Sequence, residues 1–169
     1  MKQIIIIAFV IGLAFLQSCG DDNATCTKIV SAETLASIDK TRLASDIIAI
    51  DTYLANNSIT AQSEPNGVRY VITTQGSGGT PCLENTINVK YSGILLKTGT
   101  VFNETSPEVS FKLSGLILGW QLVLPLIPAG SKVTLYIPSG LGYGVAGGAN
   151  GAIPSNANLI FEIEFISVR

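Results

Sequence analysis

The residues of this chain that could do chemistry are aromatic and aliphatic rather than ionisable. The sequence contains no histidine, which excludes Ser-His-Asp and Cys-His catalysis and most zinc sites. Trp120 is the only tryptophan and follows Gly119 in an apolar stretch, and Tyr143 lies between two glycines. A large ring beside glycine in such surroundings indicates either the centre of a core or the floor of a cavity.

Other patterns that could carry catalysis do not fit. The glycines from Gly142 to Gly148 precede no helical pattern, so they do not form a phosphate-binding loop. Glu162 and Glu164 share one face of an expected strand, which favours a solvated outer face over a glycosidase pair. The ten Lys and Arg residues are scattered and the net charge is −2, so no nucleic-acid surface is expected. We therefore expect an apolar cleft for polypeptide, with no metal and no cofactor.

Beyond residue 67 the chain alternates between apolar and polar residues, which predicts antiparallel strands with one face buried. The expected strands span residues 68–72, 87–92, 109–113, 132–137 and 159–166. Residues 97–100 are typical of a hairpin turn, and residues 139–158 form a glycine-rich loop. Only Trp120–Leu126 is compatible with a short helix in this region. The expected fold class is α+β, with an antiparallel sheet that curls around this helix.

A helix is predicted before this domain. Leu43, Ile47, Ile50 and Leu54 recur at the spacing of one helical face, and Asn56-Asn57-Ser58 ends the pattern. The stripe could pack on the main domain or form a dimer contact, and the oligomeric state is left open. The expected organisation is a signal peptide (1–18), a tether (19–37), a helix with linker (38–66) and a main domain (67–169).

The N-terminal residues are interpreted as a lipoprotein signal. Ile4–Leu16 is an apolar run of thirteen residues, which is too short to span a bilayer of about 30 Å. It ends in Leu16-Gln17-Ser18-Cys19, which resembles a bacterial lipobox. Cys19 is thus expected to carry a lipid that anchors the chain to the outer membrane, on its periplasmic face or at the cell surface. The alternative is an ordinary cleaved signal with an incidental cysteine.

Two further cysteines remain, Cys26 and Cys82. In an oxidising compartment they could form a disulfide that ties the N-terminal segment to the main domain. They could equally be two free thiols, because the sequence does not give the distance between their Cα atoms.

From about Gly67 to the C-terminus, the chain resembles an FKBP-type peptidyl-prolyl cis-trans isomerase, with its motifs in the family's order. The helix and tether before it resemble those of bacterial lipoprotein members of this family. The motifs are Val89-Lys90-Tyr91-Ser92-Gly93, Gly99-Thr100-Val101-Phe102, Val109-Ser110-Phe111-Lys112-Leu113, Leu116-Ile117-Leu118-Gly119-Trp120, Ile137-Pro138 with Leu141-Gly142-Tyr143-Gly144, and Ile153-Pro154 with Leu159-Ile160-Phe161-Glu162-Ile163.

The resemblance implies a curved sheet wrapped on a short helix, and a pocket that binds proline. It places Trp120 under the proline ring, and it assigns the Ile117 N–H and the Tyr143 hydroxyl to the substrate's carbonyl groups. The implied lining residues are Tyr91, Phe102, Val109, Leu116, Ile117, Trp120, Tyr143, Ile153 and Phe161.

The implied activity is prolyl isomerisation, with proline-containing exported polypeptides as substrates. One position departs from the family: active members usually carry Asp after the phenylalanine, and here Asn103 follows Phe102. The amide keeps the shape of the carboxylate but loses its charge. Glu104 follows and could supply the charge instead, although the next residue of a strand points to the other face. The alternative is a chaperone module that binds proline-containing or unfolded segments with little turnover.

Overall fold

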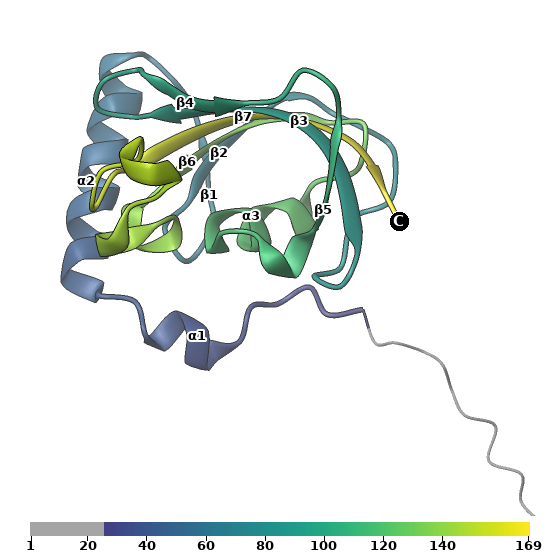
Figure 1. Ribbon diagram of the computed structural model, residues 1–169, viewed down its shortest axis with the longest axis horizontal. Coiled ribbons are helices and arrows are strands. Elements are labelled where there is room, and N and C mark those ends of the chain that lie inside the picture. The colour runs from purple at the N-terminus through teal and green to yellow at the C-terminus, as the bar shows by residue number, and fades with distance from the viewer. Residues whose placement is uncertain (1–25) are drawn as a thin grey trace, which may run out of the picture.

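The computed structural model describes residues 26–169, in which seven strands form one antiparallel sheet that arches over a short helix (Figure 1). The strand order is β1-β2-β6-β7-β3-β4, and β5 pairs with the first half of β3. The strands are β1 (Gln62–Ser63), β2 (Arg69–Thr74), β3 (Thr86–Leu95), β4 (Val101–Glu104), β5 (Val109–Lys112), β6 (Lys132–Ile137) and β7 (Leu159–Val168). The predicted α+β fold with its curved sheet is confirmed.

The sheet closes over α3 (Leu118–Val123), which continues into a 3₁₀ turn, η2 (Leu124–Leu126). Apolar residues on the inner face of the sheet pack against this helix, and Ile87, Leu135 and Phe165 are fully buried there. Gly119 allows the close approach, because a Cβ at this position would lie 2.6 Å from Cγ2 of Ile137 on β6. The glycine before Trp120 therefore lets the tryptophan reach the core.

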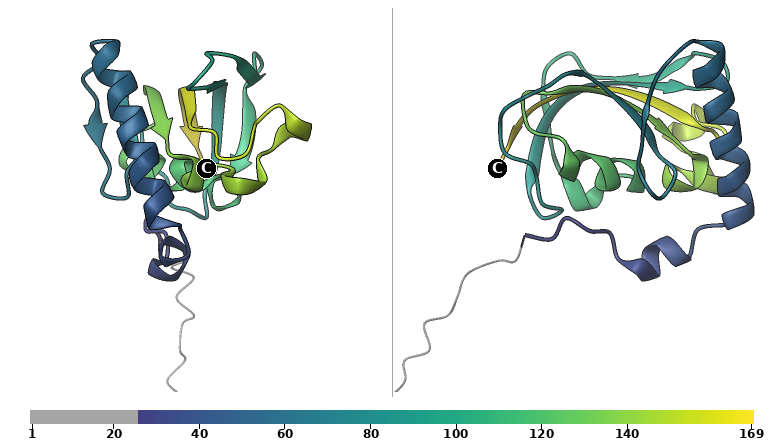
Figure 2. Two further views of the ribbon diagram at one scale, coloured as in Figure 1. Left: turned by 90° about the vertical axis from the view of Figure 1, so that its left-hand side faces the viewer. Right: turned by 180° about the vertical axis from the view of Figure 1, so that it is seen from behind.

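The predicted N-terminal helix is α2 (Lys40–Asn56), which closes one end of the domain (Figure 1, Figure 2). Its N-cap, Asp39, accepts hydrogen bonds from the N–H groups of Thr41 and Arg42. Ile50 and Leu54 are buried against Tyr136 and Ile160 of the sheet. This stripe therefore packs on the main domain, one of the two alternatives that the sequence allowed.

The segment before α2 departs from the expected tether. Residues 26–37 contain a short helix, α1 (Ala32–Ala36), and Val30 is buried in the main core. The Leu83 N–H donates a 2.7 Å hydrogen bond to the Thr27 carbonyl. These contacts fix the small polar residues that suggested a tether. They depend on residues near Leu83, far along the sequence.

Cys26 and Cys82 form a disulfide with a Cα–Cα distance of 5.2 Å and a sequence separation of 56 residues. A crosslink over such a loop stabilises a fold by about 2–4 kcal/mol, mainly by restricting the unfolded chain. The expected signal peptide, Cys19 and the rest of the tether lie outside the described residues. Among residues 26–169, no helix has the length and apolar character needed to cross a membrane.

Candidate active site

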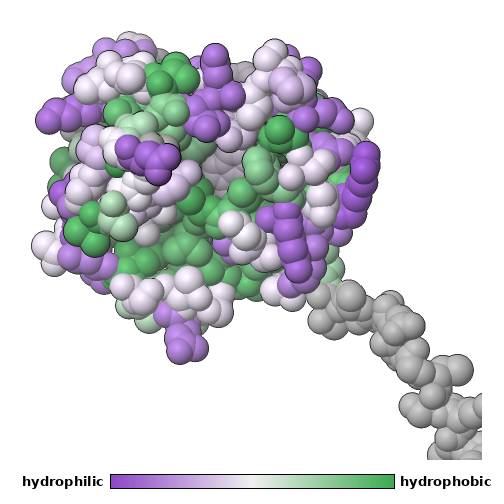
Figure 3. All heavy atoms as spheres, in the orientation of Figure 1, coloured by the Kyte–Doolittle hydropathy of each residue, from purple (hydrophilic) through white to green (hydrophobic). Residues whose placement is uncertain are grey.

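A pocket of about 200 Å³ opens between the inner face of the sheet, α3 and the loop that follows β6. Apolar side chains gather on this face of the molecule between polar ones (Figure 3). The pocket is lined by Tyr91, Phe102, Asn103, Phe111, Leu116, Ile117, Trp120, Tyr143, Ile153 and Phe161.

Aromatic rings in edge-to-face contact build the pocket. The Trp120 ring is 3% exposed and meets Tyr91 at a centroid distance of 5.5 Å and Phe161 at 5.3 Å. Phe102 meets Phe161 at 5.6 Å with an interplanar angle of 85°. Each such pair contributes about 0.5–1.5 kcal/mol beyond its burial. The rings of Tyr91, Phe102, Trp120 and Phe161 therefore hold one another in place.

Gly93 on β3 makes room for these rings. A Cβ there would lie 2.6 Å from Cζ of Phe102 and 2.9 Å from Cε1 of Phe161. Real side chains do not tolerate such distances, so any other residue would push the two rings apart. The glycine of the Val89–Gly93 motif is thus a requirement of the pocket.

A register shift between β3 and β4 sets the direction of Phe102 and Asn103. Asn103 pairs with Gly93 and Val101 pairs with Ile94, so Phe102 is an extra residue on β4. Such a bulge redirects side chains, and both Phe102 and Asn103 reach the pocket. Glu104 lies instead in a polar depression on the outer face, together with Glu162 and Glu164, as the alternation of a strand predicts.

The polar groups of the pocket are neutral. The Tyr91 hydroxyl donates a 2.7 Å hydrogen bond to Oδ1 of Asn103, which leaves the Asn103 amide nitrogen as a donor. The Ile117 N–H precedes the first turn of α3 and has no partner among the described residues. The Tyr143 hydroxyl likewise has none there. Burial raises the pKa of both tyrosines, and for Tyr91 the nearby Tyr143 raises it further.

One residue of the implied lining does not reach the pocket. Val109 is half-buried at the start of β5, where it pairs with Val89 and packs on the core. Phe111, two residues on and therefore on the same face, lines the pocket instead and meets Tyr91 at a centroid distance of 6.3 Å. The alternation of β5 could have identified Phe111, because a longer side chain on that face extends further. The other implied residues do come together.

Comparison with known proteins agrees with this geometry. The sequence profile of FKBP-type peptidyl-prolyl cis-trans isomerases matches residues 78–166. The chain is 39% identical over 108 residues to the outer membrane protein MIP of Legionella longbeachae, covering 62% of this chain and 46% of that protein. It is 33% identical over 124 residues to the isomerase FkpA of Aeromonas hydrophila, covering 70% of this chain and 45% of that one. The chain thus spans about half the length of these curated relatives.

Two solved structures are similar. A peptidyl-prolyl cis-trans isomerase from Pseudomonas syringae pv. tomato superposes with a TM-score of 0.65 at 31% identity, covering 73% of this chain and 93% of that one. FkpA from Escherichia coli gives a TM-score of 0.65 at 30% identity, covering 77% of this chain and 62% of that one. The part of this chain that superposes on FkpA is longer than the profile match at residues 78–166, so it includes residues before 78.

We predict that ligand binding in this pocket does not change between about pH 5 and about pH 9, because no lining residue ionises there. Above pH 10.0, unfolded tyrosines lose their protons, whereas Tyr91 and Tyr143 keep theirs to a higher pH. The stability from this difference is full below pH 10.0 and is lost as the pH rises through the raised pKa. Trp120 fluorescence with a proline-containing peptide measures the binding, and tyrosinate absorbance measures the ionisation. A binding curve that titrates near neutral pH would contradict the prediction.

Proposed function

Because the chain belongs to the family of FKBP-type peptidyl-prolyl cis-trans isomerases, we propose that it catalyses the cis–trans isomerisation of prolyl bonds in polypeptides. The observation that carries the proposal is an aromatic pocket over Trp120 whose free polar groups can all donate hydrogen bonds. Proline has no N–H, so a prolyl segment offers carbonyl acceptors around an apolar ring. Donors in an apolar pocket are the complement of that ligand.

The chemistry needs no acid, base or nucleophile. The barrier to amide rotation is about 18–20 kcal/mol, because resonance gives the C–N bond double-bond character. The twisted bond has lost this resonance and is less polar, so an apolar site disfavours the planar ground state relative to the transition state. In the proposed complex, Trp120 lies under the proline ring, while the Ile117 N–H and the Tyr143 hydroxyl hold the flanking carbonyl groups.

The proposed setting is the bacterial cell envelope. The disulfide between Cys26 and Cys82 supports an oxidising compartment, and one relative is named as an outer membrane protein. Uncatalysed prolyl isomerisation takes about 10–100 s at 25 °C, which is slow enough to limit the folding of exported proteins. We propose that the chain assists this folding from a lipid anchor on Cys19.

A second candidate function is binding without turnover. Asn103 favours it, because the family's usual carboxylate is replaced by a neutral amide that Tyr91 already engages. A chaperone module of this kind would retain proline-containing segments in the same pocket and would release them unchanged.

The first test follows the refolding of a protein whose slow phase is prolyl isomerisation. We expect the chain to accelerate this phase, and Phe102→Ala to reduce the catalytic efficiency about tenfold or more, which corresponds to about 1.4 kcal/mol. Trp120→Ala should abolish acceleration, but it also opens the core, so the half-buried Phe102 gives the cleaner variant. Tyr53→Ala is the matched control, since Tyr53 packs on Tyr136, away from the pocket. If the folded wild-type chain does not accelerate the slow refolding phase, the proposed isomerase activity is refuted and the binding module is favoured.

Asn103→Asp separates the two functions. The carboxylate can still accept the Tyr91 hydrogen bond, so mainly the charge changes. For an enzyme that works with a neutral site, we expect catalytic efficiency to change less than about tenfold, or less than about 1.4 kcal/mol in the barrier. A larger increase, with unchanged peptide affinity by Trp120 fluorescence, would identify the wild-type chain as mainly a binder.

Cys19→Ser tests the anchor. If Cys19 carries lipid, the wild-type chain expressed in a Gram-negative host sediments with membranes, and the variant moves to the soluble periplasmic fraction, because acyl chains supply the membrane affinity. Cys26→Ser/Cys82→Ser serves as the cysteine control and should stay with membranes. Equal distribution of the Cys19→Ser variant and the wild-type chain would exclude lipidation as the anchor.

A further inference from the structure

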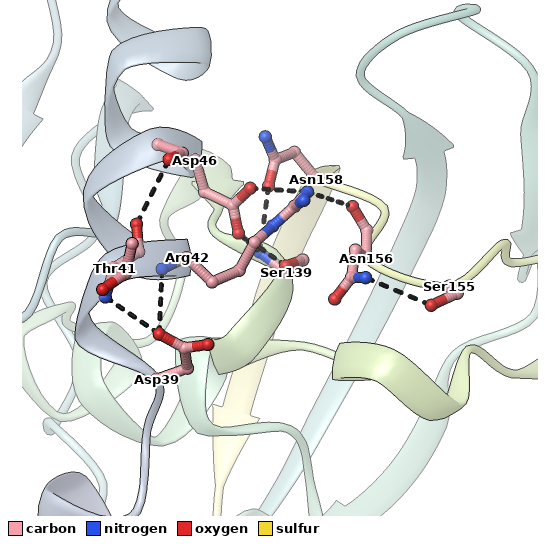
Figure 4. A network of polar contacts seen from close by, with 9 residues as sticks. Asp39, Thr41, Arg42, Asp46, Ser139, Ser155, Asn156 and Asn158 are labelled. Carbon is pink, nitrogen blue, oxygen red and sulfur yellow. Dashed lines mark hydrogen bonds and ion pairs between the residues drawn. The ribbon is translucent and has the colours of Figure 1, made fainter.

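An ion pair on α2 reaches the loop that carries Tyr143 (Figure 4). Arg42 and Asp46 lie one helical turn apart, with Nη2 of the arginine 2.9 Å from Oδ1 of the aspartate. Asp46 is only 2% exposed, although its place in a helical pattern beside Arg42 would suit a solvated surface pair. A carboxylate so deeply buried requires several partners, and these partners lie in the loop between β6 and β7.

Asp46 holds the loop on the N-terminal side of Tyr143. Its Oδ2 accepts a 2.5 Å hydrogen bond from the Ser139 hydroxyl and a 3.0 Å hydrogen bond from the Ser139 N–H, which also donates to Oδ1 of Asn158 at 2.9 Å. Ser139 is fully buried and begins the 3₁₀ turn η3 (Ser139–Leu141), whose last residue is also fully buried. Tyr143 follows two residues after this turn, so the turn fixes where the loop leaves the core.

Arg42 holds the loop on the C-terminal side of Tyr143. Its Nη2 donates a 2.9 Å hydrogen bond to the Asn156 carbonyl, and the Asn156 N–H donates a 2.8 Å hydrogen bond to the Gly144 carbonyl. Asn156 has a φ of 56°, a left-handed conformation that asparagine adopts more readily than most residues other than glycine. Asp46 therefore bonds to the loop before Tyr143, and Arg42 bonds to Asn156, which in turn bonds to Gly144 after Tyr143.

Tyr143 depends on this support. Its side chain is 37% exposed, and its hydroxyl makes no hydrogen bond among the described residues. Its loop contains three short 3₁₀ turns and no strand up to β7. The position of the ring is therefore set by the backbone, and the backbone is fixed at Ser139 and at Gly144.

We propose that Arg42 and Asp46 are positioning residues that place Tyr143 for the substrate, so that α2 is a working part of the site. The inference rests on the proposed isomerase function and deepens it. Since α2 lies before residues 78–166, the site of this chain would include residues outside the segment that the family profile matches. A displacement of about 1 Å in an orienting group is enough to reduce a catalysed rate substantially.

The test compares Asp46→Asn with Asp51→Asn in the chain from residue 26 onward. Asparagine at position 46 cannot serve both Arg42 and the two Ser139 donors, because one of its atoms is itself a donor. Asp51 is the matched control on the same helix. It pairs with Arg69 of β2 at 2.9 Å and 3.0 Å and does not contact the loop. We expect Asp46→Asn to reduce catalytic efficiency about three- to tenfold at temperatures where both variants are folded, and Asp51→Asn to leave it unchanged.

A double-mutant cycle with Tyr143→Ala distinguishes positioning from a general loss of structure. If Asp46 acts through the Tyr143 ring, Asp46→Asn has little further effect once that ring is absent, and the two losses do not multiply. Independent, multiplying losses would overturn the proposal, and so would equal activity of Asp46→Asn and the wild-type chain.

Amide hydrogen exchange measures the link between Asp46 and the loop directly, whether or not the chain is an isomerase. Asp46→Asn should accelerate exchange at Ser139, Leu141 and Gly142, whose N–H groups donate hydrogen bonds in the wild-type chain, and Asp51→Asn should not. A wild-type chain without isomerase activity would refute the function but not this linkage. Unchanged exchange in Asp46→Asn would refute the linkage, whatever the activity.

Discussion

The packing of Trp120, a residue of α3, against the inner face of the sheet is the contact on which the rest of the pocket depends. The indole fills the space under the arch and makes edge-to-face contacts with the rings of Tyr91 and Phe161. Two glycines make this arrangement possible: Gly119 lets α3 approach β6, and Gly93 leaves room for Phe102 and Phe161. At both glycines, van der Waals contact rather than a hydrogen bond sets how closely the elements approach. The shape of the pocket therefore follows from the packing of the core.

The absence of charge from the pocket lining follows from the same packing. Rings that surround a small cavity lower its effective dielectric constant, and an ionised carboxylate there would need a strong partner. Asn103 lies at the exposed rim of the pocket, where Tyr91 donates a hydrogen bond to its carbonyl oxygen and no charged group belongs to the lining. The family's usual aspartate would accept the same hydrogen bond from Tyr91, but it would carry a negative charge and would lack the NH₂ donor of Asn103. Asn103 thus lacks the charge that would polarise the site, and its amide nitrogen can instead donate a hydrogen bond to a carbonyl oxygen.

Periodic features of the fold could be predicted from the sequence, because burial repeats along a strand or a helix. The stripe with Ile50 and Leu54 gave α2, and the alternation of β7 gave the core positions of Phe161 and Phe165. Features that join distant segments could not be predicted. The 26–37 segment has a tether's composition, and only the contacts that its Cys26, Thr27 and Val30 make with the main domain show that it is packed. The choice of Phe111 over Val109, by contrast, was open to prediction, because both lie on one face of β5 and the longer side chain extends further.

The link between Asp46 and Ser139 spans 93 residues, and no local pattern marks it. A buried carboxylate contributes little net stability when it could be replaced by well-packed apolar groups, so stability alone does not account for Asp46. What the pair of Arg42 and Asp46 provides is direction: its hydrogen bonds fix one backbone N–H, one hydroxyl and one carbonyl in a loop that lacks strand pairing. A loop held only by apolar contacts could slide, whereas bonds with defined geometry at both flanks allow one position for the ring between them. The helix α2, which lies before the residues that match the family profile, therefore fixes the position of a loop that the sheet itself does not hold.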